Sequence, residues 1–153
     1  MKTIDDILIG LSPLIGEELV SDSNRACLLV FNDRIKIQLE LDITGEFLIL
    51  GSILIELPPG KFRENILKSG LKANNLIHES PGILAFIVRA NSLVLFEKIH
   101  ISRTAPDPLY KKIIQFFNKA ENWKRAIEKG EVAPRGAFPE KNPFQEPKLF
   151  GMK

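Results

Sequence analysis

The fold of this chain of 153 residues is decided by the stretch LILGSILIELPPG, residues 48–60. One serine and one glutamate interrupt its apolar residues and glycine before the prolines. An apolar run of this length predicts a largely buried β-strand over residues 46–55, which the Pro-Pro-Gly sequence ends. Gly51 and Ser52 are the expected site of a bend or bulge in that strand.

An amphipathic helix is expected at the start of the chain, over residues 3–16. Thr3 suits its N-cap, and its apolar side chains follow three-and-four spacing. These side chains are Ile4, Ile7, Leu8, Leu11, Leu14 and Ile15. Pro13 is expected to kink or restart the helix, with Ser12 able to cap the new turn.

A hairpin is expected between this helix and the apolar strand. Its two strands cover residues 26–31 and 34–41, and they are joined at Asn32 and Asp33, which tolerate the dihedral angles of a tight turn. Apolar and polar residues alternate cleanly in its second strand. One face of the hairpin is therefore expected to be buried and the other to meet water.

Two helices and two further strands are expected after the apolar strand. The helices cover residues 61–74 and 106–129, and the strands cover residues 82–89 and 92–101. Both faces of the last strand are partly apolar, which predicts that something covers each side of it. Trp123 is assigned to the buried side of the last helix because its spacing is that of an apolar seam.

The whole pattern predicts a single α+β domain over residues 1–129. Its elements follow the order α-β-β-β-α-β-β-α, and helices flank a twisted, mostly antiparallel sheet. Residues 130–153 form a separate tail rich in proline, with Phe138, Phe144 and Phe150 at six-residue intervals. A tail of this composition is expected to be flexible or extended.

Composition argues against several classes of function. Lys and Arg number 21 against 19 Asp and Glu, a net charge of +2, so no strong field favours nucleic acid. No apolar run approaches the ~18 residues that span a bilayer, and the first residues lack the pattern of a secretory signal. Cys27 is the single cysteine, which excludes a disulfide within the chain and suits a reducing cytoplasm. We expect a soluble protein with neither nucleic acid nor a membrane as its partner.

The sequence holds no motif of a catalytic or metal site. His78 and His100 are the only histidines, and together with Cys27 they do not have the spacing of zinc ligands. The glycines form neither a P-loop nor a dinucleotide-binding pattern, and no serine lies in a nucleophile elbow. We therefore expect no enzyme, no metal and no cofactor. The helices and strands offer more apolar surface than one small sheet buries, which indicates a protein partner.

Four segments carry a family resemblance in their order and spacing. CLLVFNDRIKIQLELD looks like a first hairpin, LILGSILIELPPG like a third strand that runs into Leu-Pro, FRENILKSGLKANN like a second helix, and FFNKAENWKRAI like a closing helix with a late tryptophan. The family that they resemble is the Tir-chaperone (CesT/SycE-like) family of bacterial type III secretion chaperones. The resemblance covers about residues 3–129. Family members are often acidic, whereas this chain has a pI of about 8.7.

The resemblance implies a homodimeric chaperone of the bacterial cytoplasm that binds an N-terminal segment of a secreted effector without ATP. The effector segment would be extended, would place apolar side chains in grooves and would add a strand to a sheet edge. The second helix and a neighbouring strand would form the dimer interface, through Phe62, Ile66 and Leu67. The residues implied for effector binding are Ile4, Ile7, Leu8, Leu11, Leu28 and Val30.

Other readings stay open at this point. The same fold would also serve an adaptor or regulator that binds a folded partner, and a heterodimer with a related chaperone could replace the homodimer. A third reading is a small enzyme with a site drawn from Glu97, His100 and Ser102. The tail after residue 130 is expected either to fold over an apolar groove when no effector is present or to touch a second partner.

Overall fold

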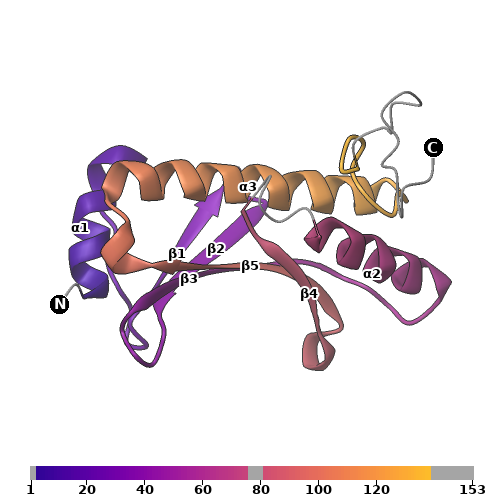
Figure 1. Ribbon diagram of the computed structural model, residues 1–153, viewed down its shortest axis with the longest axis horizontal. Coiled ribbons are helices and arrows are strands. Elements are labelled where there is room, and N and C mark those ends of the chain that lie inside the picture. Colours follow the sequence, from indigo (N-terminus) through magenta and orange to yellow (C-terminus); the bar gives the residue numbers. More distant parts are fainter. Residues whose placement is uncertain (1–2, 76–80, 139–153) are drawn as a thin grey trace, which may run out of the picture.

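The computed structural model describes residues 3–75 and 81–138, and its elements follow the predicted order (Figure 1). The α+β class and the antiparallel sheet are confirmed. The elements are α1 (Ile4–Ile15), β1 (Ala26–Phe31), β2 (Ile35–Leu41), β3 (Phe47–Glu56), α2 (Lys61–Asn74), β4 (Ile83–Ile87), η2 (Val88–Ala90), β5 (Ser92–His100), η3 (Ile101–Arg103) and α3 (Pro106–Glu128).

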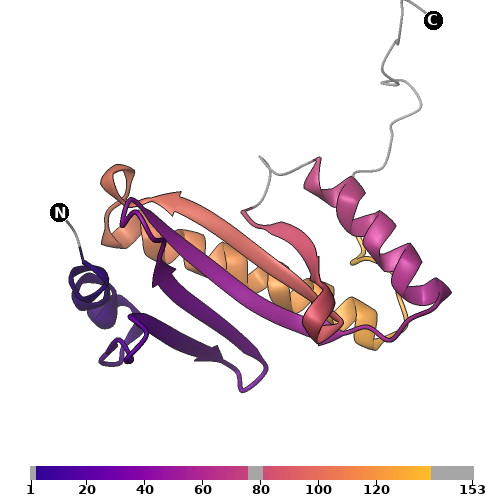
Figure 2. The same ribbon diagram turned by 90° about the horizontal axis from the view of Figure 1, so that it is seen from below.

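The sheet has five strands in the order β1-β2-β3-β5-β4, and each neighbouring pair is antiparallel. The long helix α3 runs along one face of this sheet, with α1 beside its first turns (Figure 1). Helix α2 packs against β4 at the other end of the molecule. No helix of the described chain lies on the opposite face of the sheet (Figures 1 and 2). The core therefore lies between the sheet and the helices on one side only.

The alternation in β2 builds this one-sided core. Ile35, Ile37 and Leu39 are buried toward α3, whereas Lys36 and Gln38 point to the other face and are exposed. Helix α3 contributes its own apolar stripe, as the sequence predicts. Its buried side chains are Leu109, Ile113, Phe116, Ala120, Trp123, Ala126 and Ile127.

The turn between β1 and β2 confirms the predicted hairpin. Asn32 and Asp33 both have φ of 55°. Positive φ at both central residues is the geometry of a type I′ turn, which matches the twist of antiparallel strands.

The predicted irregularity in β3 is shifted along the strand. The register of β3 against β5 breaks between Ile53 and Ile55, so Leu54 is the extra residue, rather than Gly51 or Ser52. Leu54 remains buried. The burial of an apolar side chain, rather than the freedom of a glycine, therefore sets the position of the bulge.

Helix α1 begins as predicted but does not restart at its proline. Thr3 is the N-cap, and the helix continues through Pro13 to Ile15. The Ser12 hydroxyl donates to the carbonyl of Leu8 at 2.7 Å and accepts from the amide of Leu19 at 3.0 Å. Ser12 thus fixes the chain that leaves α1 instead of capping a new turn. The proline removes one helical hydrogen bond, and the helix tolerates it because only Leu14 and Ile15 follow before the helix ends.

Two polar side chains hold Gly82, the residue just before β4. The Glu97 carboxylate accepts from the amide of Gly82 at 2.5 Å, and Lys119 Nζ of α3 donates to the carbonyl of Gly82 at 2.8 Å. Burial lowers the pKa of Lys119, with the nearby Glu97 carboxylate opposing that effect. Gly82 has φ of +109°, and a Cβ there would come within 2.8 Å of the Leu95 side chain. Both the backbone angle and the close contact therefore favour glycine.

The chain after α3 turns back onto the domain. Ala133 and Phe138 are partly buried against the core, and Lys72 Nζ lies 5.4 Å from the centroid of the Phe138 ring. Phe138 therefore packs beside α2, and the flexibility of the tail over residues 130–153 stays a prediction. Phe144, Phe150 and His78 lie outside the described residues.

A candidate partner-binding surface

The face of the sheet opposite α3 carries apolar side chains from four strands. The open face is our name for this set: Leu28, Val30, Ile49, Ile53, Ile83, Ala85, Ile87, Val94 and Phe96. Ile53 is 62% exposed, Leu28 54% and Phe96 36%. Exposed apolar side chains that gather on one face, rather than lying scattered, usually mark an interaction site.

The open face follows from the sequence of β3 and β5, where both sets of alternating residues are apolar. One set of each strand faces the core, and the other set lies on the face that no described helix covers, where Val94 is 8% exposed but Ile53 and Phe96 are 62% and 36% exposed. Phe96 is 36% exposed in the described chain, so the expectation that something covers each side of the last strand stays a prediction at that position. Sequence reasoning missed Ile49 and Ile53, although the unbroken apolar run of β3 is the signal that would have revealed them.

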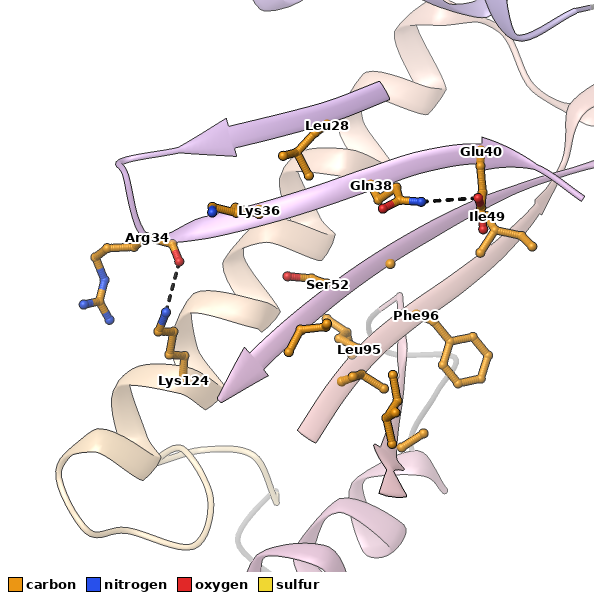
Figure 3. Close-up of a pocket in the computed structure, with 15 residues that line it drawn as sticks. Leu28, Arg34, Lys36, Gln38, Glu40, Ile49, Ser52, Leu95, Phe96 and Lys124 are labelled. Carbon is orange, nitrogen blue, oxygen red and sulfur yellow. Dashed lines mark hydrogen bonds between the residues drawn. The ribbon is translucent and has the colours of Figure 1, made fainter. Parts of the chain in front are cut away.

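A groove of about 770 Å³ opens between β2 and β3 within the open face. Leu28, Ile53 and Phe96 contribute apolar lining, and Lys36 and Lys124 lie at one end (Figure 3). Lys124 comes from α3, beneath the sheet, and its Nζ donates to the carbonyl of Arg34 at 3.1 Å. At the other end Gln38 Nε2 donates to the Glu40 carboxylate at 3.3 Å. The groove is thus apolar along its length and cationic at one end.

Ion pairs fix the cationic end to α3. Arg34 lies 3.1 Å from the Glu121 carboxylate and 2.6 Å from the Glu128 carboxylate. The hydrogen bond from Arg34 holds the pKa of Glu128 below its usual value. The β1–β2 turn is therefore tied to the last turns of α3, and the charge of Arg34 is already matched by carboxylates.

Ser52 is an unusual residue in the groove. Its side chain is 5% exposed, and its hydroxyl has no hydrogen-bond partner in the part of the chain that the structure describes. Figure 3 shows this side chain between β3 and β2. Leaving a buried hydroxyl without a partner costs roughly 1–3 kcal/mol. Natural proteins keep few such groups, so this one calls for a functional reason.

Replacing Ser52 with alanine is expected to stabilise the isolated protein. Ser52→Ala removes the unpartnered hydroxyl with little change in volume, so the free energy of unfolding should rise by about 1 kcal/mol. Urea unfolding followed by circular dichroism measures this change. A fall of similar size would mean that the hydroxyl is satisfied in solution, for example by a buried water.

The residues predicted for effector binding fall into two groups. Leu28 and Val30 lie on the open face. The other four, Ile4, Ile7, Leu8 and Leu11, are buried on the inner side of α1. The groove predicted along α1 is therefore closed in the described structure, because its apolar spacing serves the core. Contact of these four residues with an effector stays a prediction that this placement does not test.

The residues predicted for the dimer interface differ in their exposure. Ile66 is fully buried in the single chain, whereas Phe62 is 41% exposed and Leu67 is partly buried. Leu71, which the prediction did not include, is exposed on the same helix. A shallow cavity of about 200 Å³ separates α2 from β4 and is lined by Leu67, Leu71 and Phe86, among others.

The three residues of the enzyme reading do not form one site. The His100 Nδ1 lies 2.8 Å from the Ser102 hydroxyl and accepts from the Ser102 amide, so His100 caps the short helix η3. Glu97 instead binds the amide of Gly82. Within residues 3–75 and 81–138, no three His, Cys, Asp or Glu side chains gather in a way that could hold a metal ion. Over the same ranges, no helix is both long and apolar enough to cross a membrane.

Solved structures that share this fold include the following three. A chain of the ExsC–ExsE complex has 19% identity and a TM-score of 0.66, over 80% of this chain and 91% of that one. A chain of the HopA1–SchA chaperone–effector complex has 18% identity and a TM-score of 0.63 over the same shares. The Yersinia pestis type III secretion chaperone SycH, in complex with a fragment of YscM2, is the subject of a third structure, with 16% identity, a TM-score of 0.59, and coverage of 77% and 97%.

Sequence comparison gives the family directly. Curated protein sequences provide no match to this chain. The sequence profile of the Tir chaperone protein (CesT) family matches residues 7–124, which span every strand and nearly all of the helical core. The four segments that resemble this family lie within or just beside the matched range. The chain belongs to the Tir chaperone protein (CesT) family.

Proposed function

We propose that this protein is a type III secretion chaperone that binds an N-terminal segment of a secreted effector in extended form. It keeps that segment soluble and competent for secretion, and it acts in the bacterial cytoplasm without ATP, a cofactor or catalysis. Family membership supports the class of function. Structures of the same fold include chains from a chaperone–effector complex, which supports the kind of partner.

The open face is the observation that carries the proposal. It presents exposed Leu28, Ile53 and Phe96 beside a groove, on the side of the sheet that no described helix covers. An extended segment suits such a surface because its side chains alternate and can enter apolar depressions at every second residue. Burying these side chains in the complex would also shield the apolar residues of the unfolded effector from aggregation.

A homodimer is part of the proposal. Phe62 and Leu71 expose apolar surface on α2, and β4 beside it is an edge strand of the sheet. An edge strand next to exposed apolar side chains is commonly covered by a partner. The two copies would meet through α2 and β4, which leaves the open face of each copy available.

Replacing Leu71 with lysine is expected to separate the dimer. The charge would lie in an apolar interface, where burial without a partner is costly, so the sedimentation coefficient should fall from that of a dimer to that of a monomer. Ile9→Lys on α1 is the matched control, since Ile9 is equally exposed on a helix away from α2. A wild-type protein that sediments as a monomer at every concentration would rule out this interface.

Affinity purification from the native host tests the function itself. The bound material is treated with protease and the protected fragments are identified by mass spectrometry. The expected result is that one N-terminal stretch of a secreted protein is protected, while the residues that flank this stretch are cleaved. An intact, protease-resistant partner would instead favour an adaptor that binds a folded protein. Recovery of no partner would contradict the chaperone function.

A further inference from the structure

The sheet is forked between β2 and β3. β2 pairs with β1 over its whole length up to Glu40, but it pairs with β3 only from Gln38 to Leu41. β3 continues beside β5 as far as Glu56. Figure 2 shows the β1–β2 hairpin diverging from β3 toward its turn. The term fork is used below for the space between residues 35–37 of β2 and residues 52–55 of β3.

The fork exposes an internal edge of the sheet. In an antiparallel sheet, alternate residues direct their amide and carbonyl groups to one neighbour and then to the other. The pairing of β3 with β2 ends at Gly51. From Ser52 to Ile55, the backbone amides and carbonyls of β3 that do not point toward β5 therefore point into the fork. An unpaired edge of this kind is a template for another strand.

Ser52 adds a side-chain group to this edge. Its hydroxyl is buried, faces the fork and has no described partner. A hydroxyl both donates and accepts, so it can bond either the amide or the carbonyl of a passing backbone. The cost of leaving it unpaired in the free protein would be recovered when such a backbone arrives.

The charges at the fork determine which side chains of a bound segment are favoured there. The Lys36 side chain is exposed on β2 and has no hydrogen bond or ion pair within residues 3–75 and 81–138. Lys124 reaches the same end from α3, where its Nζ donates to the backbone carbonyl of Arg34 and its charge also acts on Glu128. Arg34 differs, because Glu121 and Glu128 already neutralise it. Lys36, which has no carboxylate partner in the described chain, therefore favours an acidic side chain at this end of the fork, with the charge of Lys124 beside it.

We propose that the fork binds one extended effector segment of about five residues, which pairs with β3, bonds the Ser52 hydroxyl and places an acidic side chain between Lys36 and Lys124. The inference rests on the proposed function and makes it more specific, since it assigns one docking site and the chemistry of the residue that it selects. Side chains on one side of the segment meet Ile53, and those on the other side point toward Ser52 and α3.

Two synthetic peptides test this preference in the full-length protein. Both are acetylated and amidated ten-residue chains of alternating Thr and Val, one with a central Asp and the other with a central Lys in its place. Isothermal titration calorimetry is expected to show about tenfold tighter binding of the Asp peptide. Lys36→Glu should reverse the preference, and Ser52→Ala should weaken both peptides by about two- to tenfold.

Two further readouts locate the binding. Hydrogen exchange at the amides of residues 52–55 should slow when the Asp peptide is bound, as expected for a strand added beside β3. The matched control is Lys112→Glu, an equal charge reversal on an exposed part of α3 away from the fork, and it should leave the preference unchanged. Equal binding of the two peptides, binding of neither, or a preference that survives Lys36→Glu would overturn the proposal.

The effector itself separates this inference from the proposed function. Wild-type protein and the Lys36→Glu variant are each purified from the host with whatever they bind. If the wild type holds a protected effector segment and the variant holds it equally well, the fork assignment fails while the chaperone function stands. If the wild type holds no effector, the proposed function fails whatever the peptides do.

Discussion

Leu11→Ala is expected to lower the free energy of unfolding by about 2–5 kcal/mol. Leu11 is fully buried in the cluster that also contains Leu8 of α1 and Phe116 of α3. Removing its side chain takes apolar atoms out of the core and leaves a cavity that the neighbouring helices cannot fill completely. Urea unfolding of the purified variant, followed by circular dichroism, measures the change.

Leu28→Ala is the control for this prediction, because it removes the same atoms from the open face. Leu28 is 54% exposed, so its replacement should change the stability by less than about 1 kcal/mol. Equal stability losses in the two variants would contradict the assignment of Leu11 to the core and of Leu28 to the open face. A Leu11→Ala protein that is stable but fails to bind the effector would instead support an effector-binding groove along α1.

The double replacement of Leu28 and Ile53 by aspartate is expected to weaken effector binding by at least about thirtyfold. Both side chains are exposed in the free protein, so the variant should fold normally. In the complex they would be buried against apolar residues of the effector, and a carboxylate in that place would lose its hydration without gaining a partner. The dissociation constant of the purified effector segment, measured by calorimetry, gives the effect.

Ile43→Asp is the matched control for the open face. Ile43 is a fully exposed apolar residue in the turn between β2 and β3, outside the groove. Its replacement adds one carboxylate, half the change in charge of the double variant, and should leave binding within about threefold of the wild type. Undiminished affinity in the double variant, with normal affinity in the control, would mean that the effector binds another surface.

Much of the fold was accessible from the sequence because local patterns agree with it. The alternation in β2, the positive-φ residues Asn32 and Asp33, and the apolar stripe of α3 each specify an element without reference to distant residues. The errors concern cases in which a local signal competes with packing. Pro13 does not break α1, and the bulge in β3 lies at Leu54 rather than at the glycine.

The binding surface was less accessible, because exposure depends on which elements meet. The family resemblance implied that Leu8 and Leu28 border the same groove, but α1 turns Leu8 toward the core and the sheet turns Leu28 outward. The fork depends on where the pairing of β2 with β3 ends, and no sequence motif marks that point. The sequence also does not show that the Ser52 hydroxyl is unpartnered, because a serine in an apolar strand can equally well have a hydrogen-bond partner.

Hydroxyl-radical footprinting of the complex with its effector tests the central claim most directly. Side chains that solvent reaches are oxidised, and those that the effector covers are protected. We predict strong protection of Leu28, Ile53 and Phe96 on the open face, and no change at Ile43, which is exposed in both states. Unchanged oxidation of the open face, with protection confined to other surfaces, would contradict the claim that this face of the sheet receives the effector.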